Sequence, residues 1–296
     1  MPARQRPGTR TPPAPPPRPG GAAPPPGAGT AGGTPGSADI SYIKWDMNRS
    51  LAAVWSAALP PERQGEVCHR FVLGVYGMLE QLRRDFPHVL IEGCSGGGGR
   101  FDAGMLYYTP QIWCSDNTDA IDRLRIQYGT SFCYPVSAMG AHVSAVPNAQ
   151  TGRSVSMETR GVVAMHGTFG YEMDPALVTP EEREVILRQT AFFKEHQNLI
   201  HQGDYYRLSD PFQNGPYTAW EHVSPDRREA LVSVVSGQIQ GGPPCRNLRL
   251  KGLDPDLRYQ VNGEGRYPGA ALMEAGWPLP LPWGDYQSWQ FYLTAL

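Results

Sequence analysis

Two aspartates stand out because each follows a short apolar run. Asp46 ends the stretch YIKWD and Asp116 ends the stretch QIWCSD. Two carboxylates that face each other can hydrolyse a glycosidic bond, because one protonates the leaving oxygen while the other attacks the anomeric carbon or activates water. Taken singly, each has an ordinary alternative. Asp46 is placed to pair with Lys44 or Arg49, and Asp116 is placed to cap the helix predicted after it.

The elements that must position these aspartates are predicted to alternate between strand and helix. Strands are predicted at residues 42–47, 88–95, 111–116 and within 161–174, and helices at 62–85, 116–129 and 180–202. This alternation is typical of a parallel sheet. In a parallel barrel the active site lies at the carboxyl ends of the strands, and each strand–helix unit takes roughly 31 residues. The 70 residues between Asp46 and Asp116 therefore predict that they lie two strands apart, across the barrel mouth.

The pattern changes at about residue 203, where short strand-like runs are separated by Gly, Pro and Asn turns. These runs are EALVSVVSGQ, RNLRLKGL, RYQVNG and WQFYLTAL. They predict a small antiparallel β-sandwich domain over residues 203–296, after an α/β domain over residues 39–202.

Residues 1–38 have a composition unlike the rest of the chain. They contain 12 Pro and 8 Gly with no aromatic and no acidic residue, which predicts a disordered tail. Four of the 26 basic residues lie there, so residues 39–296 carry 22 basic and 28 acidic side chains. This mildly acidic balance argues against nucleic acid as a partner.

Targeting signals and cysteines point to an ordinary intracellular protein. The tail has no apolar core of a signal peptide, and no run is long and apolar enough for a membrane span. The five cysteines are scattered and contain no C-x-x-C pair. This favours reduced thiols in a cytoplasmic protein over a disulfide framework.

Two further motifs have alternatives to weigh. The glycines at 96–99 follow a strand, as in phosphate-binding loops, but lack the Lys-Ser/Thr of a P-loop and the acid of a dinucleotide site. Close approach of the backbone to a sugar explains them better. Cys94, Cys114 and Cys133 lie near strand ends without the paired spacing of a metal site, so buried packing is the favoured interpretation.

Several longer stretches resemble a known family. YIKWDMNRS, IEGCSGGGGRFDAGMLYYTPQIWCSDNTDAIDRLRIQYGTSFCYP and RGVVAMHGTFGYEMD resemble the α-galactosidases of glycoside hydrolase family 36, and KGLDPDLRYQVNGEG and LMEAGWPLPLPWGDYQSWQFYL resemble that family's C-terminal β domain. The resemblance runs from about Asp39 to the C-terminus. It implies a retaining enzyme that removes terminal α-galactose from sugars such as melibiose and raffinose. It further implies an α-galactoside oligosaccharide as ligand, no cofactor or metal, and homo-oligomers among full-length relatives.

The resemblance also assigns roles to single residues. Asp46 matches the family's nucleophile and Asp116 its acid/base. Lys44 lies beside Asp46, and we expect its charge to keep the nucleophile ionised. The expected substrate-binding residues are Lys44 and Asn48 on galactose hydroxyls, Cys94 and Gly97 on the C2 side of the sugar, and Trp45, for which core packing is the alternative to stacking on the sugar.

Part of the family's fold has no counterpart in this sequence. The family begins with a β-sandwich and three strand–helix units, where this chain has only its Pro/Gly-rich stretch. We therefore expect a partial (β/α)₈ TIM barrel, about strands 4–8, with open edges at the strand of residues 42–47 and at the strand within 161–168. A truncated gene or a faulty gene model would explain this.

Three alternatives to an α-galactosidase remain. A catalytically incomplete remnant would bind a sugar or a partner subunit. Within enzymes, the alternatives are an α-N-acetylgalactosaminidase or a galactosyl transferase. The C-S-G-G-G loop around Cys94 favours plain galactose over the N-acetyl sugar.

Overall fold

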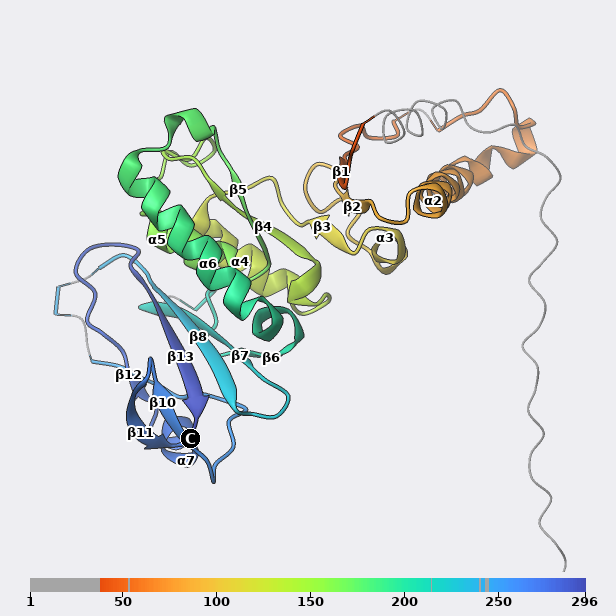
Figure 1. The fold of residues 1–296 in the computed structure, drawn as a ribbon. Coiled ribbons are helices and arrows are strands. Elements are labelled where there is room, and N and C mark those ends of the chain that lie inside the picture. Colours follow the sequence, from red (N-terminus) through yellow and green to blue (C-terminus); the bar gives the residue numbers. More distant parts are fainter. Residues whose placement is uncertain (1–37, 53, 214, 240, 243–244) are drawn as a thin grey trace, which may run out of the picture.

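The structure, a computed structural model, describes residues 38–296 except 53, 214, 240 and 243–244. The predicted disordered tail lies outside these residues, apart from Ala38. The described chain forms a parallel sheet with helices and, below it in Figure 1, an antiparallel sheet. No helix in these ranges combines the length and apolar character needed to cross a bilayer.

The first sheet has five parallel strands in chain order. They are β1 (Tyr42–Trp45), β2 (Leu90–Gly93), β3 (Gln111–Trp113), β4 (Met139–Ser144) and β5 (Thr168–Glu172). The prediction of a partial barrel is confirmed by this half-barrel. Within the described ranges, no further strand pairs with the outer edge of β1 or of β5.

Helices connect these strands. They are α2 (Val67–Asp85), α3 (Ala103–Tyr108), α4 (Ala120–Thr130), α5 (Met157–Ala164) and α6 (Pro180–Gln202), with 3₁₀ turns η1 (Pro61–Glu66), η2 (Val136–Ala138) and η3 (Pro175–Leu177). The helix predicted at 62–85 thus starts as a 3₁₀ turn. Thr179 and Glu182 form a capping box at the start of α6, where each side chain accepts the other's backbone N–H at 3.2 Å.

The structure differs from the sequence prediction in two neighbouring elements. Strand β4 was not predicted, because glycine and polar residues interrupt its apolar pattern. Gly140 is required there, since a Cβ would lie 2.8 Å from Trp113. The strand predicted within 161–174 is β5, but residues 161–164 at the start of that run belong to the end of α5, which Ser156 caps by accepting the Thr159 N–H. A buried helix and a buried strand have similar apolar runs, so periodicity alone does not separate them.

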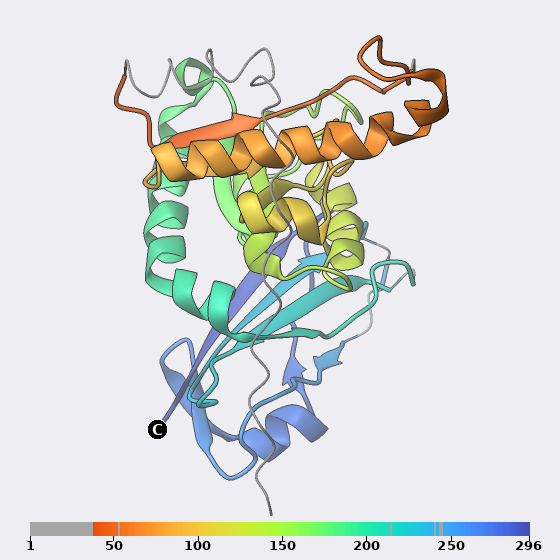
Figure 2. The ribbon, with the colours of Figure 1, turned by 90° about the vertical axis from the view of Figure 1, so that its right-hand side faces the viewer.

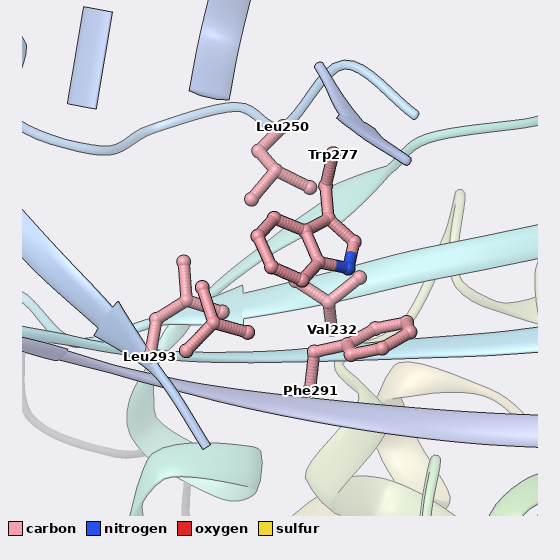
Figure 3. Close-up of a pocket in the computed structure, with 6 residues that line it drawn as sticks. Val232, Leu250, Trp277, Phe291 and Leu293 are labelled. Atoms are coloured by element: carbon pink, nitrogen blue, oxygen red, sulfur yellow. The ribbon is translucent and has the colours of Figure 1, made fainter. Parts of the chain in front are cut away.

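The second sheet confirms the predicted antiparallel domain. Its strand order is β11-β10-β13-β8-β7-β6, formed by β6 (Asp204–Arg207), β7 (Tyr217–Val223), β8 (Glu229–Ser236), β10 (Arg258–Val261), β11 (Glu264–Pro268) and β13 (Ser288–Ala295). The second layer consists of α7 (Gly269–Glu274) and a small sheet of β9 (Asn247–Leu248) with β12 (Trp277–Pro278). Figure 3 shows this layer closing the core, with Trp277 lying over Val232 and Phe291.

The other face of the second sheet packs on the helices of the half-barrel. Trp220 and Val235 join a buried cluster with Leu124 of α4 and Val162 of α5, and α6 runs from one sheet to the other (Figure 2). The Thr159 hydroxyl donates to the Tyr286 carbonyl at 2.8 Å across this contact. The β domain therefore supports the helices that lie behind the predicted site.

Candidate active site

The predicted site residues gather at the carboxyl ends of the first three strands. Asp46 directly follows β1, Cys94 directly follows β2, and Asp116 comes three residues after the end of β3. Because β2 lies between β1 and β3, the two aspartates are on loops two strands apart, in agreement with the spacing argument.

A glycine-rich loop fills the space between these two aspartate loops. On one side, the Ser95 hydroxyl donates to the Met47 carbonyl at 2.8 Å and the Gly96 N–H donates to the Asn48 side-chain oxygen at 2.8 Å. On the other side, a Cβ on Gly97 would lie 2.9 Å from the Asp116 backbone nitrogen. The loop therefore touches both aspartate loops.

This contact changes the explanation of the glycines. We expected them to allow a sugar close to the backbone, but Gly97, Gly98 and Gly99 are already required by the chain itself. A Cβ would lie 2.8 Å from the Cys114 carbonyl oxygen at Gly98 and 2.6 Å from the Ser95 carbonyl oxygen at Gly99. Gly97 also has a φ of +80°, which side-chain-bearing residues rarely adopt.

Asp46 is surrounded by hydrogen-bond donors. The Met47 N–H donates to Oδ1 at 2.8 Å and the Asn48 amide donates to Oδ2 at 2.7 Å. Burial pushes the pKa of Asp46 upward, but hydrogen bonds from the Cys94 thiol, from Asn48 and from the Met47 and Gly96 backbone outweigh it and hold the pKa below its ordinary value. The carboxylate is therefore kept ionised by its own loop and the glycine loop.

Lys44 is directed toward β2 and β3. Its ammonium lies 3.7 Å from the Glu92 carboxylate and 4.4 Å from the centre of the Trp113 ring. Hydrogen bonds are the main groups that lower the pKa of Asp46. The expected ionised state of Asp46 is therefore supported by its hydrogen bonds, and the expected contribution of the Lys44 charge stays a prediction.

Asp116 is exposed and is held from its own strand. The Trp113 indole N–H donates to Asp116 Oδ1 at 3.1 Å, and Gln150 donates to the Asp116 backbone carbonyl at 2.9 Å. Trp113 is buried. Trp45 packs with the apolar cluster under α2, which includes Leu79 and fits the core-packing alternative; its contact with a sugar remains a prediction.

Comparisons with known proteins identify the family. Residues 35–203 match the family model Melibiase, and residues 217–293 match the model of the glycosyl hydrolase family 36 C-terminal domain. The chain belongs to the melibiase family.

The relatives in this family are longer than the chain. Alpha-galactosidase AgaA of Geobacillus stearothermophilus is 53% identical over 260 residues, which are 88% of this chain and 36% of AgaA. The bifunctional alpha-galactosidase/sucrose kinase AgaSK of Mediterraneibacter gnavus is 56% identical over 258 residues, which are 87% of this chain and 27% of AgaSK. The crystal structure of AgaA superposes with a TM-score of 0.89 at 51% identity, covering 91% of this chain and 37% of AgaA. The chain spans about a third of the length of such melibiase relatives.

The sequence analysis missed a layer of polar side chains on the inner face of the melibiase half-barrel. It includes Glu92 on β2, Gln111 on β3, His142 on β4 and Glu172 on β5. Gln111 donates to Glu92 at 2.9 Å, and His142 lies 3.5 Å from Glu172. A single acid inside the apolar strand LIEGC was the available signal, but strand register was needed to place it opposite Lys44.

No metal site is evident among the residues placed by the structure. Cys94 is buried, Cys114 is half-buried and Cys133 is exposed. No three His, Cys, Asp or Glu side chains in the described ranges are arranged to hold a metal ion.

Proposed function

We propose that this chain carries one half of the active site of a retaining α-galactosidase, with Asp46 as nucleophile and Asp116 as acid/base. The observation that carries the proposal is the glycine-rich loop after β2, which packs against both the Asp46 loop after β1 and the Asp116 loop after β3. Hydrogen bonds also hold the pKa of Asp46 low, as a nucleophile requires, since only the ionised carboxylate can attack the anomeric carbon.

The remaining predicted residues fit roles around the sugar. Lys44 meets Glu92 at ion-pair distance without a hydrogen bond, so its N–H donors are available to galactose hydroxyls. Asn48 uses one amide N–H on Asp46 and its oxygen on Gly96, which leaves its second N–H for a hydroxyl. Cys94 and Gly97 belong to the loop that we place against the C2 side of the sugar.

The proposed substrates are galacto-oligosaccharides of the raffinose type. Solved structures of variants of AgaA, a relative about 50% identical to this chain, are complexes with raffinose and with stachyose. We assign the half-barrel to residues 39–202 and the β domain to residues 203–296. Among the residues that the structure describes, the outer edges of β1 and β5 have no partner strand, which supports the further proposal that additional barrel strands complete the pocket. The three exposed cysteines suit a reducing, cytoplasmic location.

Two matched substitutions test the catalytic roles. The chain is assayed alone and fused to the N-terminal part of AgaA, which would supply further barrel strands. Asp46→Asn should abolish turnover of every α-galactoside. Asp116→Asn should nearly abolish hydrolysis of raffinose but spare the first step with aryl galactosides, whose acidic phenols leave without a proton.

Azide separates the two roles further, because it attacks without help from a general base. It should rescue Asp116→Asn and give a product with retained configuration, which proton NMR detects at the anomeric carbon. Rescue of Asp46→Asn with retained configuration, or of Asp116→Asn with inverted configuration, would mean that the roles are exchanged. If neither substitution lowers kcat/KM more than about tenfold, the pair is not catalytic. If the fused chain binds galactose but hydrolyses no α-galactoside, the alternative of a catalytically incomplete, sugar-binding remnant is favoured.

A further inference from the structure

Glu92 is a buried carboxylate that the proposed chemistry does not use. Its side chain is completely buried, and only one of its oxygens has a hydrogen bond, accepted from Gln111 at 2.9 Å. The other oxygen, Oε1, has no hydrogen-bond partner among the described residues and lies 3.7 Å from the Lys44 ammonium. A buried carboxylate that is only half satisfied destabilises a fold, so its presence requires a reason.

Strand register explains the pairing of Glu92 with Lys44. The two residues are direct partners across β1 and β2, so their side chains leave the sheet on the same face. The Lys44 ammonium also lies 4.4 Å from the centre of the Trp113 ring, and the Trp113 indole N–H donates to Asp116. A continuous series of contacts therefore runs from Glu92 through Lys44 and Trp113 to Asp116.

We propose that Glu92 is a positioning residue that holds the Lys44 ammonium over Trp113, so that its N–H donors face the hydroxyls of the α-galactoside. The Trp113 ring and the Glu92 carboxylate both attract the ammonium, at 4.4 Å and 3.7 Å, and together they restrict its position. At 3.7 Å the attraction fixes the ammonium without consuming a donor. The assignment of the sugar to Lys44 rests on the proposed function, whereas the hold of Glu92 on Lys44 does not.

The charge of Glu92 changes close to neutral pH. Burial raises the pKa of Glu92 to about 7, and the negative charge of Glu172 adds to this, while the Gln111 hydrogen bond opposes it. The other groups on this face are Lys44 from β1 and His142 from β4, and burial lowers the pKa of His142. Lys44 is therefore held firmly above about pH 7 and released as Glu92 takes up a proton below it.

The small number of lysines allows a direct test. The chain has three lysines, Lys44, Lys194 and Lys251. Reductive methylation with ¹³C-formaldehyde labels each of them, and Lys44→Arg assigns the Lys44 signal by its loss. The Lys44 signal should shift with a midpoint near pH 7. Glu92→Gln should remove this inflection and leave the signals of Lys194 and Lys251 unchanged. Glu80→Gln, an exposed change on α2, is the control and should leave all three.

Kinetics distinguish positioning from a structural role. In the fused, active protein, Glu92→Gln should raise KM about tenfold with little change in kcat, since a binding donor is misplaced while both aspartates remain. Glu92→Asp should recover part of this loss. If the Lys44 signal titrates in Glu92→Gln as it does in the unsubstituted chain, the proposal is overturned. If Glu92→Gln does not fold, the unsubstituted chain decides: a Lys44 signal without an inflection near pH 7 overturns the proposal. If no form hydrolyses an α-galactoside, the proposed function fails, while the NMR titration still decides the role of Glu92.

Discussion

Asn48 and Gly96 are joined by a hydrogen bond of 2.8 Å from the glycine backbone N–H to the asparagine side-chain oxygen. The same asparagine donates to Asp46 at 2.7 Å. One side chain therefore fixes the proposed nucleophile and the glycine-rich loop together, and its removal should loosen both.

Asn48→Ala should shift the pH dependence of activity. Because a hydrogen-bond donor to the carboxylate is lost, the pKa of Asp46 should rise and the acid limb of kcat/KM should move to higher pH. We expect kcat/KM at acidic pH to fall on the order of tenfold, and by less at neutral pH. Rates on a chromogenic α-galactoside between acidic and neutral pH measure this, with the neighbouring exposed Ser50→Ala as control. An acid limb that stays in place would show that Asn48 does not stabilise the ionised nucleophile.

Gly97→Ala should impair both stability and activity. Gly97 has a φ of +80°, and a Cβ would lie 2.9 Å from the Asp116 backbone nitrogen. Gly152 is a matched control, because its φ is +69° and nothing lies within 4 Å of its Cβ position. Gly152→Ala should lower the free energy of unfolding by only about 1 kcal/mol, the cost of placing alanine in a left-handed backbone conformation. Urea unfolding measures this loss. Gly97→Ala should lose clearly more and should lower kcat through displacement of Asp116. If both variants lose the same free energy of unfolding, the close approach of Gly97 to the Asp116 backbone does not contribute to stability.

Cys94 should resist alkylation in the folded protein. Burial and the hydrogen bond to Asp46 raise the pKa of the Cys94 thiol to about 11, so almost none of the reactive thiolate forms at pH 8. Iodoacetamide followed by peptide mass spectrometry should modify the exposed Cys68 and Cys133 first. Labelling of Cys94 should need denaturant. Rapid native labelling of Cys94 would mean that the loop opens readily.

Glu221 in the β domain should make stability fall with rising pH. It is completely buried on β7, and burial raises its pKa to about 8, against the Lys251 N–H hydrogen bond and the Lys251 charge. A carboxyl in the unfolded chain releases its proton near its ordinary pKa of about 4.3, so between that value and 8 the folded state binds more protons. The Glu221 contribution is therefore complete below pH 4 and lost as pH rises through 8.

Glu221→Gln should flatten this dependence, because the amide does not ionise. Urea unfolding of the chain from pH 5 to pH 9 measures the slope, and the expected difference is on the order of a few kcal/mol. Glu264→Gln, on the exposed strand β11, is the control and should retain the slope of the unsubstituted protein. If Glu221→Gln keeps the same slope, another buried group causes the dependence.

Local sequence signals predicted several elements of the fold correctly but did not predict others. The strand around Ile43, the helix α6 with its Thr179 cap and the two-strand separation of Asp46 and Asp116 all follow from alternation, capping residues and spacing along the chain. Strand β4 was not predicted, and the end of helix α5 fell within a run predicted to contain a strand, because small residues in a strand and apolar residues in a buried helix mask their periods.

The sequence also did not predict which charged side chains lie next to one another in the site. Lys44 and Asp46 are close in sequence, yet Lys44 lies against Glu92, which is 48 positions away along the chain. The register between β1 and β2 decides this pairing, and neither composition nor motif spacing encodes register by itself. The same holds for the glycines, whose tight contact with the Asp116 loop appears only when β2 and β3 are side by side.

Strand β1 carries the proposed nucleophile on the edge of the described sheet, with a neighbour on one side only. An edge strand of four residues opens locally at a lower free-energy cost than a strand paired on both sides, so its amides should exchange with solvent before those of β2 and β3. Asp116 follows β3, which has neighbours on both sides. The two carboxylates are therefore unequally anchored, and the hydrogen bonds from Ser95 and Gly96 act as a brace that compensates for the weaker strand.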